Sequence, residues 1–153
     1  MLKSTTKLLV FILLCVIGIS SKAQVVSGLK APSPGEMGKF TEWQSVDVKF
    51  DDGTSAKIEY RIALAMRKGI ACHYDLEVKN NSDQKVKVRL KSNYYDKFVK
   101  SYFGEEIKET LKPGKGITGR LIAQGCKKDK GSKVEDYDLC TSCDFSASIF
   151  VEK

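Results

Sequence analysis

Apolar and charged residues alternate along most of the chain beyond residue 45. Between Ala56 and Met66 every second side chain is apolar or aromatic, and Lys57, Glu59 and Arg61 stand at intervening positions. A period of two places apolar side chains on one face of a strand and charged side chains on the other. The same alternation recurs over residues 46–50, 70–78, 86–90 and 145–151. The pattern predicts antiparallel strands that turn one face to a core and the other to solvent.

Short polar segments separate these strands and predict turns. They are Asp51–Gly53, Arg67–Gly69, Asn80–Asp83 and Lys112–Gly114. Apolar runs at residues 107–111 and 117–126 predict two more strands, whereas residues 93–106 are irregular and residues 127–139 predict a charged loop. About seven strands in roughly 110 residues are typical of a β-sandwich. We therefore expect an all-β antiparallel sandwich, with a jelly roll or a small barrel as the alternative.

Two motifs carry a family resemblance. The segments YDLEVKNNSDQKVKVRL (residues 74–90) and ETLKPGKGITGRLIA (residues 109–123) contain a V-x-N-N-S hairpin and an L-x-P-G turn. They resemble the middle strands of bacterial immunoglobulin-like and fibronectin-III-like domains, and the resemblance covers residues 56–125. It implies an immunoglobulin-like strand order and a domain that binds, spaces or stiffens rather than catalyses.

The first 23 residues have a different composition. Lys3 and Lys7 precede an almost wholly apolar run over residues 8–19, and Ser21 and Ala23 are small. This order predicts a secretory signal peptide cleaved after Ala23. The apolar run is shorter than the ~20 residues that span a bilayer, so a retained membrane anchor, or a lipoprotein modified at Cys15, is a weaker interpretation.

Cleavage leaves a mature chain with no transmembrane segment. Residues 24–39 are rich in proline and glycine and predict an extended leader or linker, and residues 40–153 have the length of one β-sandwich domain. The S-K-A-Q junction resembles those of exported proteins from Gram-negative bacteria, which implies a periplasmic, cell-surface or secreted location. The net charge falls from +7 to +4 because the signal carries three lysines and no acid. The remaining lysines are mixed with acids, so we expect no nucleic-acid partner.

Four cysteines remain after cleavage: Cys72, Cys126, Cys140 and Cys143. In an oxidising compartment an even set predicts two disulfides in one of three connectivities. If the strand order is immunoglobulin-like, the strands at 70–78, 117–126 and 145–151 are neighbours, and all four sulfurs gather at one pole beside His73.

Zinc binding and thiol redox chemistry are the alternatives at these cysteines. A zinc site here needs four thiolates, or three thiolates and His73. Only Cys140 and Cys143 have the C-x-x-C spacing that is typical of one half of such a site. The acids Asp138 and Asp144 flank that pair and raise a thiol pKa, which weakens a nucleophile. We therefore expect structural disulfides and neither a metal nor a cofactor.

Aromatic residues provide the candidate contact surface. Tyr94, Tyr95, Tyr102 and Phe103 lie in the irregular segment, and exposed aromatics on a sandwich can stack on sugars or anchor a protein. Plugging the ends of the sandwich is the structural alternative for them. The charged loop at residues 127–139 is a second candidate surface.

The sequence contains no hydrolase, nucleotide-binding or zinc-protease motif, and His73 is its single histidine, placed by the alternation on an outer face. We predict an exported, non-enzymatic binding or structural module of the cell envelope, whose partner is a protein or a glycan. A carbohydrate-binding module that uses the same aromatics, or a cysteine-based metal-binding protein, is the alternative.

Overall fold

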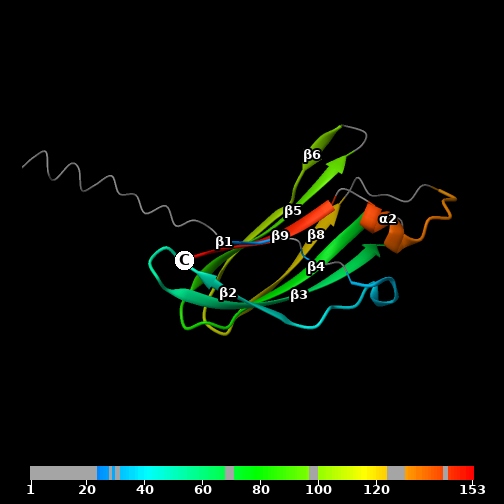
Figure 1. Cartoon of the computed structure of the whole chain (residues 1–153). Coiled ribbons are helices and arrows are strands. Elements are labelled where there is room, and N and C mark those ends of the chain that lie inside the picture. The colour runs from blue at the N-terminus through cyan, green and yellow to red at the C-terminus, as the bar shows by residue number, and fades with distance from the viewer. Residues whose placement is uncertain are drawn as a thin grey trace, which may run out of the picture.

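Two antiparallel β-sheets pack face to face in the computed structural model (Figure 1). The structure describes residues 24–27, 29, 32–67, 71–96, 100–123, 130–142 and 145–153, so the predicted signal peptide lies outside the described residues. The all-β sandwich expected from the alternation is confirmed. Within the described part of the chain, no helix has the length and apolar character needed to cross a membrane.

The first sheet contains four strands in the order β2-β3-β4-β8. Their bounds are β2 Gln44–Lys49, β3 Ser55–Arg67, β4 Ala71–Asn80 and β8 Gly116–Ala123. β3 and β4 pair along ten residues of each strand, from Ile58 opposite Asn80 to Arg67 opposite Ala71. These strands coincide closely with the predicted ones, because a half-buried strand shows its alternation directly in the sequence.

The second sheet is built around the long strand β5, Val86–Asp96. The strand β9, Phe145–Glu152, pairs with one edge of β5, and the short strand β1, Gln24–Val26, extends the sheet beyond β9. The other edge of β5 pairs with β7, Glu106–Leu111, and then, further along, with β6, Ser101–Phe103. In Figure 1 the distal half of β5 and its partner β6 stand out from the rest of the sheet.

The immunoglobulin-like strand order implied by the resemblance is wrong in two places. It puts the strands at 56–66 and 70–78 in opposite sheets, but β3 and β4 pair with each other in the first sheet. It also places the strand at 145–151 beside the strand at 117–126, but β9 pairs with β1 and β5 in the opposite sheet. Both sheets turn an apolar face to the same core, so an alternating strand fits either one. Alternation specifies which side chains are buried and leaves the neighbouring strand undetermined.

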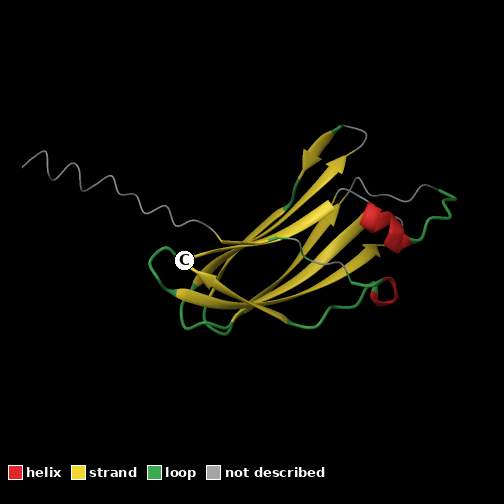
Figure 2. Cartoon of the chain, viewed as in Figure 1, coloured by secondary structure: helices red, strands yellow, loops and turns green. Residues whose placement is uncertain are grey.

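The proline-rich segment at residues 24–39, expected to be a leader or linker without a core, packs against the domain. β1 pairs with β9, and Val26, Leu29 and Met37 pack against the hydrophobic core. The amide of Gly38 donates to the carbonyl of Leu64 at 2.8 Å. A short 3-10 helix, η1 (Pro34–Glu36), lies in this segment, and Figure 2 shows it at the same end of the sandwich as the other short helix. The segment has too few apolar residues for a periodic signal, and its contacts with the sheets are long-range.

The segments expected to be irregular contain regular structure. β5 continues to Asp96 and forms a hairpin with β6 within residues 93–106. Within residues 127–139, predicted as a charged loop, residues 127–129 lie outside the described residues and the helix α2, Asp136–Ser142, begins.

A continuous core lies between the sheets. Its largest fully buried side chains are Ile58, Ile62, Leu64, Leu76, Leu90, Leu121 and Ile149. They come from the alternating positions of β3, β4, β5, β8 and β9. Complete burial of such a side chain contributes about 1.5–3 kcal/mol relative to its exposure to water.

The two resembling motifs meet at one buried side chain. Asn80 is 0% exposed, and its side-chain amide donates to the carbonyls of Gln84 at 2.7 Å and Leu111 at 3.0 Å. Its carbonyl oxygen accepts hydrogen bonds from the backbone amide and the hydroxyl of Ser82. The main chain of Asn80 also accepts from the amide of Gly114 at 2.8 Å. Asn80 therefore joins the N-N-S turn to the L-K-P-G turn and fixes the end of the sandwich opposite α2.

Candidate functional site

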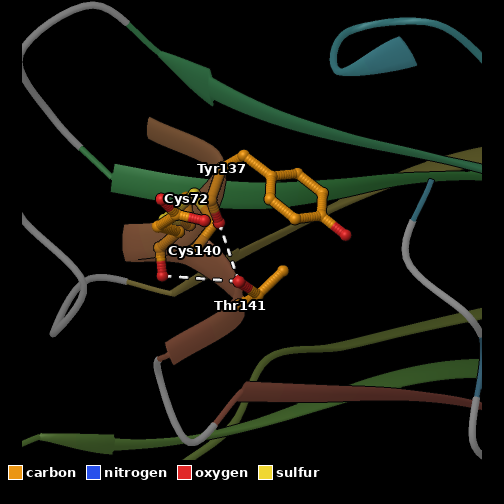
Figure 3. Close-up of a disulfide and its surroundings, with 5 residues drawn as sticks. Cys72, Tyr137, Cys140 and Thr141 are labelled. Carbon is orange, nitrogen blue, oxygen red and sulfur yellow. Dashed lines mark hydrogen bonds between the residues drawn. A yellow bond between two sulfur atoms is a disulfide. The ribbon is translucent and has the colours of Figure 1, made fainter. Parts of the chain in front are cut away.

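A disulfide between Cys72 and Cys140 joins the start of β4 to α2 (Figure 3). The two Cα atoms lie 5.4 Å apart, within the normal range for a disulfide, and both residues are buried in the core cluster. The bridge closes a sequence separation of 68 residues. Because both half-cystines are shielded from solvent, this bridge has a structural role.

Of the four cysteines predicted to gather at one pole, the structure describes Cys72 and Cys140, which lie together, whereas β9 belongs to the other sheet. Ala123, at the end of β8, pairs with Cys72, and Phe145 begins β9 close to α2 in the chain. Cys126 and Cys143 lie outside the described residues. The bridge between Cys72 and Cys140 occurs in one of the three possible connectivities. That connectivity pairs Cys126 with Cys143, and this second disulfide stays a prediction.

The helix α2 is short and is held by contacts beyond its own backbone. Asp136 and Asp138 lie in its first turn, where a carboxylate interacts favourably with the positive end of the helix dipole. The hydroxyl of Thr141 donates to the carbonyl of Tyr137 at 3.0 Å (Figure 3), and Tyr137 itself packs partly buried against the core. Burial raises the pKa of Tyr74, and the neighbouring phenol of Tyr137 adds to the shift. Seven residues cannot form a stable isolated helix, so the disulfide and Tyr137 supply the anchoring.

His73 is more buried than the sequence predicts. The alternation places it on the outer face, opposite Cys72, but the residue is only 6% exposed. Its Nε2 lies 3.5 Å from an Asp75 carboxylate oxygen, and Asp75 accepts two hydrogen bonds from Arg120, at 2.6 and 3.0 Å. Donating to Asp75 raises the pKa of Arg120. Within the described residues, no group of three or more potential metal ligands is brought together.

The candidate aromatic residues lie on the β5–β6 hairpin. Tyr94 pairs with Phe103 and Tyr95 pairs with Tyr102 across the two strands. The rings of Tyr95 and Tyr102 lie 5.0 Å apart between centroids and are tilted by 58°. Tyr102 is 63% exposed and Phe103 is 42% exposed, whereas only the backbone of Tyr94 is described. Tyr102 and Phe103 are therefore not buried plugs at the end of the sandwich.

The base of this hairpin is tightly attached to the sandwich. The amide of Ser92 donates to the carbonyl of Glu105 at 3.0 Å, and a Glu105 carboxylate oxygen accepts from the amide of Ile122 on β8 at 2.7 Å. A Cβ atom on Gly104 would lie 2.4 Å from the Ser92 carbonyl oxygen, so only glycine permits this approach. Glu105 thus links the two sheets and caps an edge amide of β8 that another strand could otherwise pair with.

An open cleft of about 390 Å³ lies at the outer side of β5, β7 and β9. Lys87, Arg89 and Lys108 line it, together with Glu109, Thr110 and Glu152. The guanidinium of Arg89 lies 4.7 Å above the ring of Phe150 and forms ion pairs with Glu152 at 3.2 Å and Glu106 at 3.4 Å. This cleft is not predictable from the sequence, because the alternating cations at 85–91 indicate an exposed face and not whether that face is hollowed.

Trp43 lies outside both of these surfaces. The Nζ atom of Lys79 is 4.0 Å from the centroid of its ring, and the guanidinium of Arg61 is 4.8 Å away. Arg61 also forms an ion pair with Glu77 at 2.6 Å. Trp43 is therefore engaged by cations from β3 and β4 on the outer face of the first sheet.

No protein-family model matches the chain, and no curated protein matches it. Among solved structures, the trimeric lipoprotein SadB from Salmonella enterica aligns with it at a TM-score of 0.40 and 12% sequence identity. The alignment covers 97% of this chain and 71% of that chain. A similarity this distant identifies no family.

Proposed function

We propose that the chain is an exported, non-enzymatic binding module of the cell envelope that contacts its partner through the β5–β6 hairpin. Many cell-surface domains share the two-sheet sandwich architecture, which supports this class of role. Export rests on the signal pattern of residues 1–23 and on the disulfide between Cys72 and Cys140, because such bridges persist in oxidising compartments. The buried bridge stabilises the domain and leaves no reactive thiol in that pair.

The exposure of Tyr102 and Phe103 carries the proposal. Within the described residues, the exposed large apolar side chains are these two and Val134. An aromatic side chain loses little conformational entropy when it binds, and contacts of this type dominate the energetics of many interfaces. The hydrogen bonds at Ser92 and Glu105 hold the hairpin at its base, so its aromatic side chains are presented on a fixed support.

The proposal is tested by co-sedimentation of the purified mature protein with the insoluble envelope fraction of the producing cells. We expect Tyr102→Ala/Phe103→Ala to reduce the bound fraction at least tenfold, because two aromatic contacts of more than 1 kcal/mol each are lost. Lys57→Ala is the control, since it removes an exposed side chain from the first sheet, away from both candidate contact surfaces. All three proteins should unfold at closely similar temperatures.

Equal binding of the double variant and the wild type would show that the hairpin is not the contact surface. Digesting the envelope fraction with proteinase K beforehand then separates a protein partner from a glycan partner. Loss of binding after digestion identifies a protein, and retained binding identifies a polysaccharide or lipid component.

A further inference from the structure

The exposed tyrosines and the cationic cleft lie on the same face of the second sheet. Successive side chains of a strand point to opposite faces, so every second residue of β5 shares one face. The outer row of β5 is Lys87, Arg89, Lys91, Asn93 and Tyr95, since Val88, Leu90 and Ser92 between them are buried in the interior. Tyr102 is the β6 partner of Tyr95 and lies beside it on this face.

The neighbouring strands complete a surface with three zones. At one end is the cleft around Arg89, where Lys108 of β7 and Phe150 of β9 are the cross-strand partners of that arginine. In the middle, Lys91 and Asn93 pair with Ser148 and Ser146 of β9. At the other end the Tyr95–Tyr102 ring pair forms an aromatic platform. We call this surface the outer β5 face.

The outer β5 face has an excess of positive charge. Its cations are Lys87, Arg89, Lys91 and Lys108, and its acids are Glu106, Glu109 and Glu152. Glu106 and Glu152 pair with Arg89, and Glu106 also pairs with Lys108 at 3.4 Å. Among the described residues, Lys87 and Lys91 form no ion pair, so two cations remain available to an anionic ligand.

The outer face of the first sheet differs in this respect. Arg61 pairs there with Glu77, and Arg120 pairs with Asp75. Lys79 lies against Trp43. Arg61, Lys79 and Arg120 are therefore already engaged within the protein on that face.

The size of the outer β5 face selects an extended ligand. From Lys87 to Tyr95 the strand advances eight residues, or about 27 Å at roughly 3.4 Å per residue. A ligand that reaches the aromatic platform and the cleft together must span about this distance, as an extended polymer does. It must also offer ring faces for stacking, hydroxyl groups for Asn93, Ser146 and Ser148, and anionic groups for the lysines.

We infer that the outer β5 face binds a linear polysaccharide that carries carboxylate groups, with sugar rings on Tyr95 and Tyr102 and carboxylates at Lys87 and Lys91. The inference rests on the proposed binding function and names the partner of that site. A folded protein partner fits less well, because the centres of protein interfaces are depleted in lysine and this centre contains Lys91.

The test measures binding of the mature protein to four purified probes by isothermal titration calorimetry. The first two are oligosaccharides of alginate and of polygalacturonate, both linear polymers of uronic acids. Dextran oligosaccharides provide a neutral glycan, and poly-L-glutamate provides the same charge on a polypeptide. We expect binding to at least one uronic-acid polymer to be at least tenfold tighter than binding to poly-L-glutamate, and no binding to dextran.

Variants of the two ends of the surface locate the site. Lys87→Gln/Lys91→Gln should weaken binding about tenfold, because it removes two exposed ion pairs to the ligand and each contributes a factor of roughly three to the affinity. Tyr102→Ala should weaken it about fivefold or more. Lys39→Gln/Lys57→Gln removes the same charge from exposed positions elsewhere and should change the affinity less than twofold. Equal unfolding temperatures show that the variants remain folded.

Three results would overturn the inference. The first is the absence of binding to both uronic-acid polymers. The second is equal affinity for poly-L-glutamate, which means that charge alone is recognised. The third is equal weakening by the control pair of substitutions. If envelope binding still depends on Tyr102 and Phe103 and is lost after proteinase K digestion, the proposed function stands with a protein partner and the polysaccharide inference fails.

Discussion

Replacing Asn80 with alanine removes the side chain that joins the two turns at one end of the sandwich. Asn80 is fully buried and makes four side-chain hydrogen bonds, two as a donor and two as an acceptor. Each such bond contributes about 1 kcal/mol net, and a carbonyl left buried without a partner, such as that of Leu111, costs about 1–3 kcal/mol. We expect Asn80→Ala to lower the free energy of unfolding by about 3–5 kcal/mol. That is a large share of the roughly 5–15 kcal/mol available to a domain.

The measurement is urea denaturation of the mature protein, followed by circular dichroism and by the fluorescence of Trp43. Asn81→Ala is the matched control, because Asn81 is exposed and its recorded bond to Lys57 is made by the backbone amide. The control should change stability by less than about 0.5 kcal/mol. Asn80→Asp retains the oxygen that accepts from Ser82 but sets a second carboxylate oxygen against two carbonyls, so it should destabilise at least as much as alanine. If Asn80→Ala costs less than about 1 kcal/mol, the assigned role of Asn80 is wrong.

Three further predictions concern other parts of the fold. Cys140→Ser breaks the bridge to Cys72 and should lower the free energy of unfolding by about 4 kcal/mol relative to the wild type, measured by chemical denaturation. Under strong reductant the wild type loses the same bridge, so the two proteins should then be equally stable. Gly104→Ala places a Cβ atom 2.4 Å from the carbonyl oxygen of Ser92 on β5. The resulting strain of about 1–3 kcal/mol should lower the midpoint of thermal unfolding by several degrees, and an unchanged midpoint would show that the two strands do not approach this closely. The hydrogen bond from Lys153 holds the pKa of Asp52 below its ordinary value of 3.8, so this carboxylate stabilises the fold at neutral pH and loses that effect as the pH falls below about 4. Lys153→Gln should raise the Asp52 pKa in an NMR titration, and an unchanged pKa would show that Lys153 is not the cause.

The sequence pattern predicts the strands well because the alternation of apolar and polar residues within a half-buried strand shows which of its faces is buried. Residues 55–67 and 71–80 alternate over their full length, and the structure forms strands there with the expected faces. The same logic could not place β9, because either sheet of the sandwich accepts an alternating strand. It could not identify α2 either, since that helix depends on a disulfide and on Tyr137 rather than on an apolar periodicity.

The sequence indicates the aromatic residues of the candidate contact surface, but neither their arrangement nor the cationic cleft beside them. Tyr102 and Phe103 are exposed as a contact surface requires, although their segment carries no regular alternation. Two features were beyond reach of the sequence: the register that sets Tyr95 beside Tyr102, and the continuity of that pair with Arg89 and its cleft. Both depend on the pairing of β5 with three other strands, which is a property of the folded sheet.

Site-specific photo-crosslinking in the producing cells reports whether the β5–β6 hairpin lies against a partner of the envelope. A benzophenone amino acid is introduced as Tyr102→p-benzoylphenylalanine, and as Lys57→p-benzoylphenylalanine on the first sheet for comparison. Benzophenone reacts with nearby C–H bonds of proteins and glycans alike, so the readout does not presuppose the class of partner. We expect a discrete crosslinked species at position 102 in the envelope fraction and none at position 57. Equal crosslinking at the two positions, or none at position 102, would show that the hairpin is not the contact surface.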